Sequence, residues 1–361
     1  MPKPPARLAW IDARRIDEFE CVASVLLAIL LAHAIGAENV SWAAFSGYMV
    51  MRGHAAETVL RGILRIIGTI AGGVLALLLV PPAAHSLVIA TLVVGLVAAV
   101  TLYAAITARR AYAWLFVGLT FVMVLFDKLE HPAARVLPFV ETRILEVIAG
   151  TFACMLVSLV STVTLRRYWP AIRSAPAKSH GWHPESARHA AQAAVAVMLL
   201  PWLGAAWQVP ALAQSAVTIM AVMLVPVTGI GPSGLAPVSR RLLYRFIGCI
   251  AGAALAAVFL LTAQGSAPIL ILGTMIGVAI GRHIENGSHT RTYVGTQFTL
   301  AILTTLVPDS YVAAEIGPGL ERLAGILIGV VLLEPVLIAW HLLSPARRGV
   351  EATTRGELGD I

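Results

Sequence analysis

The sequence predicts an all-α polytopic membrane protein of about twelve transmembrane helices, arranged as two parallel repeats of six helices each. Composition predicts the membrane class: hydrophobic residues make up 58% of the 361 residues and charged residues only 12%, about half the charged share of a soluble domain. An internal duplication predicts the two repeats. A pattern of arginines and glycines recurs at a nearly constant offset along most of the chain.

The duplicated pattern is R-x3-R-x2-G-x3-G, and its two copies are 180 positions apart. The copies are formed by Arg61, Arg65, Gly68 and Gly72, and by Arg241, Arg245, Gly248 and Gly252. Further pairs keep nearly the same offset: Arg110 and Tyr112 with Arg291 and Tyr293, and Arg143 and Gly150 with Arg322 and Gly329. Such spacing indicates duplication, and two similar halves of a membrane protein commonly frame a transport path between them.

Twelve apolar stretches account for the expected helices, and most approach the roughly 20 residues that a helix needs to cross a bilayer. In the first half they cover 18–36, 41–52, 61–81, 86–107, 110–126 and 141–165. In the second half they cover 187–204, 211–228, 241–263, 267–281, 291–307 and 318–343. The stretch 41–52 is short, so it either extends past Arg52, is tilted or is broken.

We therefore expect four segments along the chain. Residues 1–165 form the first membrane repeat with a short cytoplasmic N-terminal segment, and 166–186 form a polar cytoplasmic linker. Residues 187–343 form the second repeat, and 344–361 a cytoplasmic tail.

The basic residues indicate the orientation of these segments. With twelve crossings, 22 of the 26 Lys and Arg side chains fall on the side that holds both termini and the linker; the other side keeps Lys128, Arg135, Arg143 and Arg322. Because basic loops stay in the cytoplasm, both termini are expected there. The net charge of +7 is then an orientation signal plus attraction to the lipid bilayer, and it requires no nucleic-acid partner. Six crossings per half also make the two halves run in the same direction.

The order and spacing of several motifs resemble a known family. The motifs are Ser41-Trp42-Ala43-Ala44, Arg61-x3-Arg65-x2-Gly68-x3-Gly72, Arg109-Arg110-x-Tyr112 and Arg143-x2-Glu146-x3-Gly150. Together they resemble the membrane half of the fusaric acid resistance family, also called aromatic acid exporters, and more distantly the plant aluminium-activated malate channels. The resemblance covers 18–165 well and 187–343 more loosely. It implies a multi-pass protein of the bacterial inner membrane that exports aromatic carboxylates, or an anion channel as in the plant relatives.

The chain departs from the long exporters of this family. They have a sizeable cytoplasmic domain between the halves, whereas about twenty residues separate the halves here. The resemblance therefore does not carry over a regulatory or partner-docking role for such a domain. A homo-oligomer or a periplasmic partner leaves no mark in the sequence.

The paired arginines Arg61/Arg65 and Arg241/Arg245 have two interpretations. Each pair lies one helical turn apart, on one face of its helix. The structural interpretation is that they anchor the helix by reaching to the membrane interface. The functional interpretation is that both pairs converge and bind an anionic substrate at the cytoplasmic mouth, because guanidinium matches a carboxylate in bidentate geometry. The accompanying glycines, Gly68, Gly72, Gly248 and Gly252, are expected to allow close helix packing.

Arg143 and Arg322 are expected on the extracytoplasmic side, each at the beginning of the last helix of its half. Glu146 lies near one turn from Arg143 and could neutralise it, so one interpretation is an intrahelical ion pair. The other is an exit-side anion gate, with Glu146 as a candidate for proton coupling. In the eleventh stretch, hydroxyls such as Thr299 and the amide of Gln297 either bond to their own helix or line a polar path.

Other classes of function lack their residues. The three cysteines, Cys21, Cys154 and Cys249, are scattered in apolar stretches and are expected to be buried, with no metal site and no disulfide framework. No Gly-Lys dipeptide occurs, so the P-loop for ATP is absent. We expect no enzyme activity and no cofactor. The sequence favours an inner-membrane exporter of small organic anions, coupled to protons; a passive anion channel and a membrane scaffold without transport remain the alternatives.

Overall fold

The computed structural model describes residues 12–171, 181–207, 209, 211–230, 234–287, 291–309 and 315–343. Within these ranges all regular structure is helical. The segment before residue 12, the central part of the expected linker and the expected tail from 344 onward lie outside the described residues.

Six helices form the first half, one for each expected stretch. They are α1 (Ala13–Ala34), α2 (Val40–Val50), α3 (Ala55–Ala83), α4 (Leu87–Thr107), α5 (Ala111–Glu130) and α6 (Val136–Val163). Polar side chains begin two of them: Asp12 accepts a hydrogen bond from the backbone N–H of Arg15 at the start of α1, and Ser86 accepts one from Ile89 at the start of α4. These contacts satisfy backbone donors that have no partner within the helix.

The second half follows the same order with one interruption. Its helices are α7 (Pro184–Met198), α8 (Leu200–Trp207), α9 (Leu212–Val222), α10 (Leu235–Ala263), α11 (Ala267–Glu285), α12 (Thr292–Leu306) and α13 (Gly317–Leu343), with one 3₁₀ turn (Val227–Gly229) after α9. The expected stretch 187–204 is divided between α7 and α8 at Leu199. Pro201 accounts for the break, because it has no N–H to donate to the carbonyl four residues earlier.

Eight of the described helices are long and apolar enough to cross a membrane: α3, α4, α5, α6, the α7–α8 pair, α10, α11 and α13. Their outward faces are apolar as well. Leu78, Leu96 and Leu261 are 68%, 66% and 79% exposed, which suits contact with lipid and not with water. The chain is therefore a multi-pass membrane protein.

Two helices, α2 and α9, are only half as long as a membrane crossing. Each has 11 residues, about 16 Å at the usual rise per residue, against about 30 Å of hydrocarbon. The expectation of one continuous span over 211–228 was wrong: α9 stops at Val222, and Pro226 disfavours helical geometry in the residue before it. The stretch 41–52 ends before Arg52, and a non-helical segment leads into α3.

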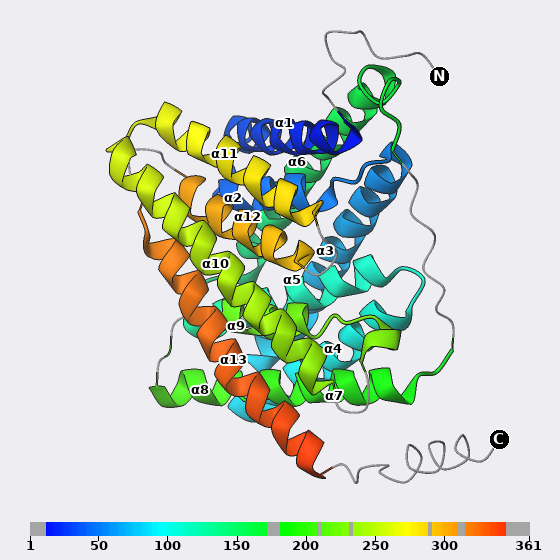
Figure 1. Ribbon diagram of the computed structural model, residues 1–361. Coiled ribbons are helices and arrows are strands. Elements are labelled where there is room, and N and C mark those ends of the chain that lie inside the picture. Colours follow the sequence, from blue (N-terminus) through cyan, green and yellow to red (C-terminus); the bar gives the residue numbers. More distant parts are fainter. Residues whose placement is uncertain are drawn as a thin grey trace, which may run out of the picture.

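The helices that carry the duplicated pattern pack closely on their neighbours. α3 contacts α5 and α6, and α10 contacts α12 and α13; Figure 1 shows α10 and α13 side by side. A Cβ added to Gly72 would lie 2.6 Å from the carbonyl oxygen of Val117, and one added to Gly248 would lie 2.5 Å from that of Val294. Gly68 and Gly252 meet the carbonyls of Ala113 and Phe298 in the same way, so none of the four positions has room for a side chain.

The halves meet at several helix pairs, among them α5 with α9 and the two pairs named next. α1 lies beside α11, as Figure 1 shows, and α4 contacts α7. Each pair joins one helix from each half of the chain. The α1–α11 contact is charged, and it is described with the site below.

Candidate functional site

The first arginine cluster, Arg61, Arg65 and Arg143, lies between α3, α5 and α6. The Arg61 guanidinium stacks 3.8 Å from the centre of the Tyr112 ring, and its Nε donates to the carbonyl of Met49. Arg65 is 2% exposed. Its Nε donates to Ser46 Oγ at 3.1 Å, and its guanidinium lies 4.1 Å from the centre of the Phe116 ring.

The second arginine cluster, Arg241, Arg245 and Arg322, has the same framework in α10, α12 and α13. Arg241 stacks 4.4 Å from the centre of the Tyr293 ring and donates to the carbonyl of Ala221 at 3.3 Å. Arg245 donates to the hydroxyl of Tyr293 at 3.3 Å, as Arg65 does to the hydroxyl of Tyr112 at 3.5 Å. Each tyrosine therefore holds both arginines of its pair.

Arg143 and Arg322 are buried within their helices. α6 begins at Val136, five residues before the expected start, so Arg143 lies inside it; Arg143 and Arg322 are 6% and 3% exposed. The expected helix start near Arg143 is therefore corrected, whereas α13 begins at Gly317, one residue before its expected start. Arg143 stacks 4.1 Å from the centre of the Trp42 ring, one turn of α2 from Ser46, which Arg65 contacts. Arg322 bonds to Gln297, one turn of α12 from Tyr293, which Arg245 contacts. Each is therefore part of the cluster of its half.

Counter-charge is nearly absent from the two clusters. Glu146 pairs with Arg143, with Oε2 3.2 Å from the guanidinium, which agrees with the intrahelical ion pair expected from the sequence. Among the described residues, the other five arginines have no carboxylate within ion-pair distance. Aromatic faces and hydroxyls partly compensate, but a buried charge without a counter-ion is costly. Such groups are more often functional than stabilising.

The N-termini of the two half-length helices meet carboxylates from distant parts of the chain. The backbone N–H of Val40, at the start of α2, donates to Asp309 Oδ1 at 2.8 Å, and that of Leu212, at the start of α9, donates to Glu130 Oε1 at 2.7 Å. Glu146 also accepts from the N–H of Asn39 at 3.0 Å. Negative charge is favourable at the positive end of a helix dipole. Burial raises the pKa of Asp309, which the bond from Val40 opposes.

The C-termini of the same helices meet arginines. Met49 and Ala221, which accept from Arg61 and Arg241, occupy the last turns of α2 and α9 at equivalent positions. Cations are favourable there, at the negative end of the dipole. The first arginine of each pair therefore fixes the end of a half-length helix as well as stacking on tyrosine.

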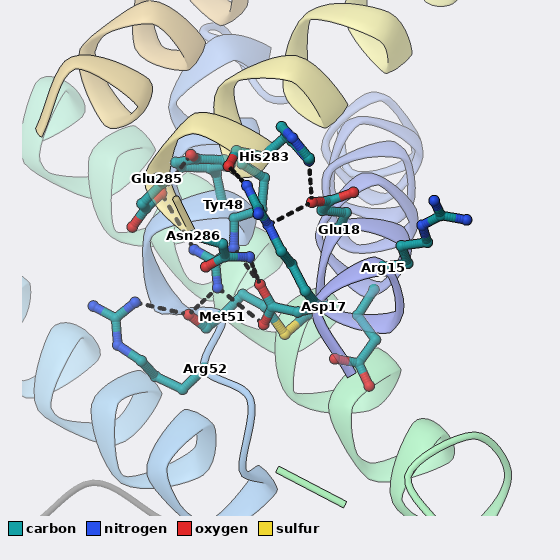
Figure 2. A network of polar contacts seen from close by, with 12 residues as sticks. Arg15, Asp17, Glu18, Tyr48, Met51, Arg52, His283, Glu285 and Asn286 are labelled. Carbon is teal, nitrogen blue, oxygen red and sulfur yellow. Dashed lines mark hydrogen bonds and ion pairs between the residues drawn. The ribbon is translucent and has the colours of Figure 1, made fainter. Parts of the chain in front are cut away.

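A third set of charges, the α1–α11 network, comprises Asp17, Glu20, Arg166, Arg282 and Glu285; Figure 2 shows Asp17 and Glu285. Asp17 accepts from Arg282 at 2.6 and 3.1 Å, and Glu20 accepts from Arg166 at 2.8 and 2.6 Å. Arg282 is also 3.3 Å from Glu285. The network joins α1, α11 and the segment after α6, so it couples the two halves of the chain.

The network also reaches the end of α2. Arg282 donates to the carbonyl of Met51 at 3.3 Å, and the hydroxyl of Tyr48 donates to Glu285 at 2.5 Å; Figure 2 shows Tyr48, Met51 and Glu285 gathered there. Arg52 donates to the same carbonyl at 3.0 Å. Burial, followed by the nearby charges of Arg61 and Arg282, lowers the pKa of Arg52 to about 10.

Sequence reasoning missed this network. Arg166 and Arg282 were counted as loop residues that set orientation, whereas Arg282 lies inside α11 and is 3% exposed. The sequence does contain a signal for the network: Arg282 directly follows an apolar stretch, and acidic residues that could pair with it occur elsewhere in the chain. Glu130 and Asp309 were missed as well, although their offset of 179 equals that of Arg143 and Arg322.

The hydroxyls of α12 follow the first of the two interpretations and bond to their own helix. The hydroxyls of Thr296, Thr299, Thr304 and Thr305 donate to carbonyls four residues earlier in their own helix. Gln297 is different, because its Oε1 accepts from Arg322 at 3.3 Å. Among the described residues, no group of three or more His, Cys, Asp or Glu side chains is placed to hold a metal ion.

Comparison with known proteins identifies the first half of the chain. Residues 19–193 match the model of the fusaric acid resistance protein family. The match runs from α1 into α7 and includes the whole first arginine cluster. It confirms the resemblance drawn from the motifs. No curated protein and no solved structure matches the chain.

Proposed function

We propose that this fusaric acid resistance family protein exports small organic anions, in particular aromatic carboxylates, across the bacterial inner membrane in exchange for protons. One observation carries the proposal. Buried arginines with almost no internal counter-charge lie at equivalent places in both halves, beside the ends of two half-length helices. An anionic substrate supplies the charge that these sites lack.

The half-length helices support the location of the site. In transporters built from repeats, short or interrupted hydrophobic segments at corresponding positions often mark the substrate site, because helix ends there present charge to the substrate. α2 and α9 are such a pair, with Arg61 and Arg241 at their C-terminal ends. The aromatic faces of Tyr112 and Tyr293 suit a flat, hydrophobic acid as well as the guanidinium groups.

The orientation completes the proposal. In this proposal Arg61, Arg65, Arg241 and Arg245 face the cytoplasmic entrance and both termini lie in the cytoplasm, because basic residues gather on the cytoplasmic side of membrane proteins. Arg143 and Arg322 lie deeper and pass the anion outward. Glu146 is the proton-coupling residue, because protonation of its carboxyl group would release Arg143 to interact with the anion.

Uptake into inside-out membrane vesicles tests this function. Labelled benzoate should accumulate when an acid-inside proton gradient is imposed, and the double variant Arg61→Ala/Arg241→Ala should lose that accumulation. Uptake that ignores the gradient would indicate a passive anion channel. Absence of uptake of any aromatic or aliphatic acid by well-folded protein would favour a scaffold.

A further inference from the structure

The two arginine clusters differ in one respect that bears on where the anion binds. In the first cluster, Glu146 supplies a carboxylate to Arg143 at 3.2 Å. With the offset of 179 that relates Arg143 to Arg322, the position equivalent to Glu146 is Gly325. The second cluster therefore lacks the carboxylate that the first one has.

Close packing fills the place of that missing carboxylate. A Cβ added to Gly325 would lie 2.5 Å from Cβ of Gln214 and 3.2 Å from the carbonyl oxygen of Ala211. The neighbouring Glu321 does not substitute for it, because Glu321 is exposed and makes no ion pair with the buried Arg322. Among the described residues, no carboxylate lies within ion-pair distance of Arg322, and its neighbours Gln297, Cys249 and Tyr293 supply an amide, a thiol and a hydroxyl.

Several donors of the second cluster are left without an acceptor. The Nε atoms of Arg241, Arg245 and Arg322 are buried and have no hydrogen-bond partner. Arg245 and Arg322 are 2% and 3% exposed, and they bond to Tyr293 and Gln297, which lie one helical turn apart on α12. Two adjacent buried guanidiniums with free donors form an arrangement that one carboxylate could satisfy in bidentate fashion.

We propose that the second arginine cluster is the binding site for the carboxylate of the exported anion, and that Arg245, Arg322 and Gln297 hold it. The bound carboxylate takes the role that Glu146 has in the first cluster. The first cluster, already partly neutralised, carries the anion less tightly. The duplicated halves are thus specialised, one for holding the anion and one for an internal ion pair. This inference rests on the proposed function for the nature of the anion.

Replacing Gln297 by Glu tests the site without disturbing its shape. The new carboxylate would lie at hydrogen-bond distance from Arg322 and act as a built-in counter-ion. The matched control is Gln264→Glu, which adds the same charge at an exposed position after α10. Thermal melting of the full chain in detergent, at low chloride, would be followed with benzoate, with neutral benzamide and with chloride as probes.

We expect benzoate to raise the melting temperature of the wild type and of Gln264→Glu, and benzamide to have no effect. In both Gln297→Glu and Arg322→Gln the benzoate concentration for half-maximal stabilisation should rise by about thirtyfold or more. The first variant blocks the charge of Arg322 with a carboxylate, and the second removes that charge. An unchanged benzoate response in Gln297→Glu, absence of a response in the wild type, or an equal response to chloride at the same concentration would overturn the inference.

Vesicle uptake separates this inference from the proposed function. If Gln297→Glu transports benzoate as the wild type does, the site is wrong while export stands. If the benzoate-dependent stabilisation depends on Arg322 and Gln297 but the wild type does not accumulate benzoate, the site stands and export is wrong.

Discussion

Removing one partner of the α1–α11 network should destabilise the protein strongly. Asp17 is 7% exposed and Arg282 3%, and two hydrogen bonds of 2.6 and 3.1 Å join them. Asp17→Asn leaves Arg282 with less counter-charge in a buried place, which costs about 3–5 kcal/mol. The unfolding equilibrium should therefore change by a factor of roughly a hundred or more.

Reversible unfolding in mixed micelles, followed by tryptophan fluorescence during titration with SDS, measures this change. Arg282→Gln should be destabilised similarly, and the double variant should be destabilised by less than the two single effects added together, with a coupling of about 1–3 kcal/mol. Glu18→Gln is the control, because Glu18 pairs with the more exposed Arg14 and His283 and should lose at most about 1 kcal/mol. Additive effects, or an Asp17→Asn loss as small as that of the control, would refute the reasoning.

Three further changes have expected outcomes. Glu146→Gln removes the partner of Arg143 and should abolish gradient-driven benzoate uptake; uptake with normal gradient dependence would remove Glu146 from the coupling mechanism. Burial raises the pKa of Asp309 above its ordinary 3.8, so its carboxyl group binds a proton more tightly in the folded state than in the unfolded state. The stability of the fold should therefore fall as pH rises from 3.8 through the raised value. Asp309→Asn should show less of that fall in thermal melts across this range. Gly248→Val places a side chain against the carbonyl of Val294. This overpacking should cost about 1–3 kcal/mol of stability or more and should lower the melting temperature markedly; an unchanged melting temperature would contradict the packing described for α10 and α12.

The positions of most helices could be predicted from the sequence because lipid imposes a simple rule. A helix that crosses the hydrocarbon satisfies all its own backbone groups, so an apolar stretch of the right length predicts one. The rule does not say where a helix ends inside the protein. α9 ends at Val222 within an apolar stretch, where Pro226 disfavours further helix and Arg241 bonds to the carbonyl of Ala221. Composition alone does not predict a helix end from either feature.

The arginines show what could and could not be predicted about the site. The duplicated spacing placed Arg61 with Arg65 and Arg241 with Arg245 on single helix faces, and the structure adds the tyrosine that each pair shares. The partners of Arg282 could not be predicted, because Asp17 is 265 positions away in sequence and only the packing of α1 on α11 brings them together. Counting charges by loop assumes that basic residues are exposed, and this assumption fails for the buried Arg282.

Arg245→Gln tests the central claim most directly, namely that the arginine clusters are present for anions and not for stability. The variant is to be measured twice, by uptake of labelled benzoate into inside-out vesicles under a proton gradient and by SDS unfolding without ligand. Because Arg245 has no counter-ion among the described residues, its removal should leave the ligand-free protein as stable as the wild type or more stable, while uptake is lost. Normal uptake, or a loss of stability as large as that expected for Arg282→Gln, would contradict the account.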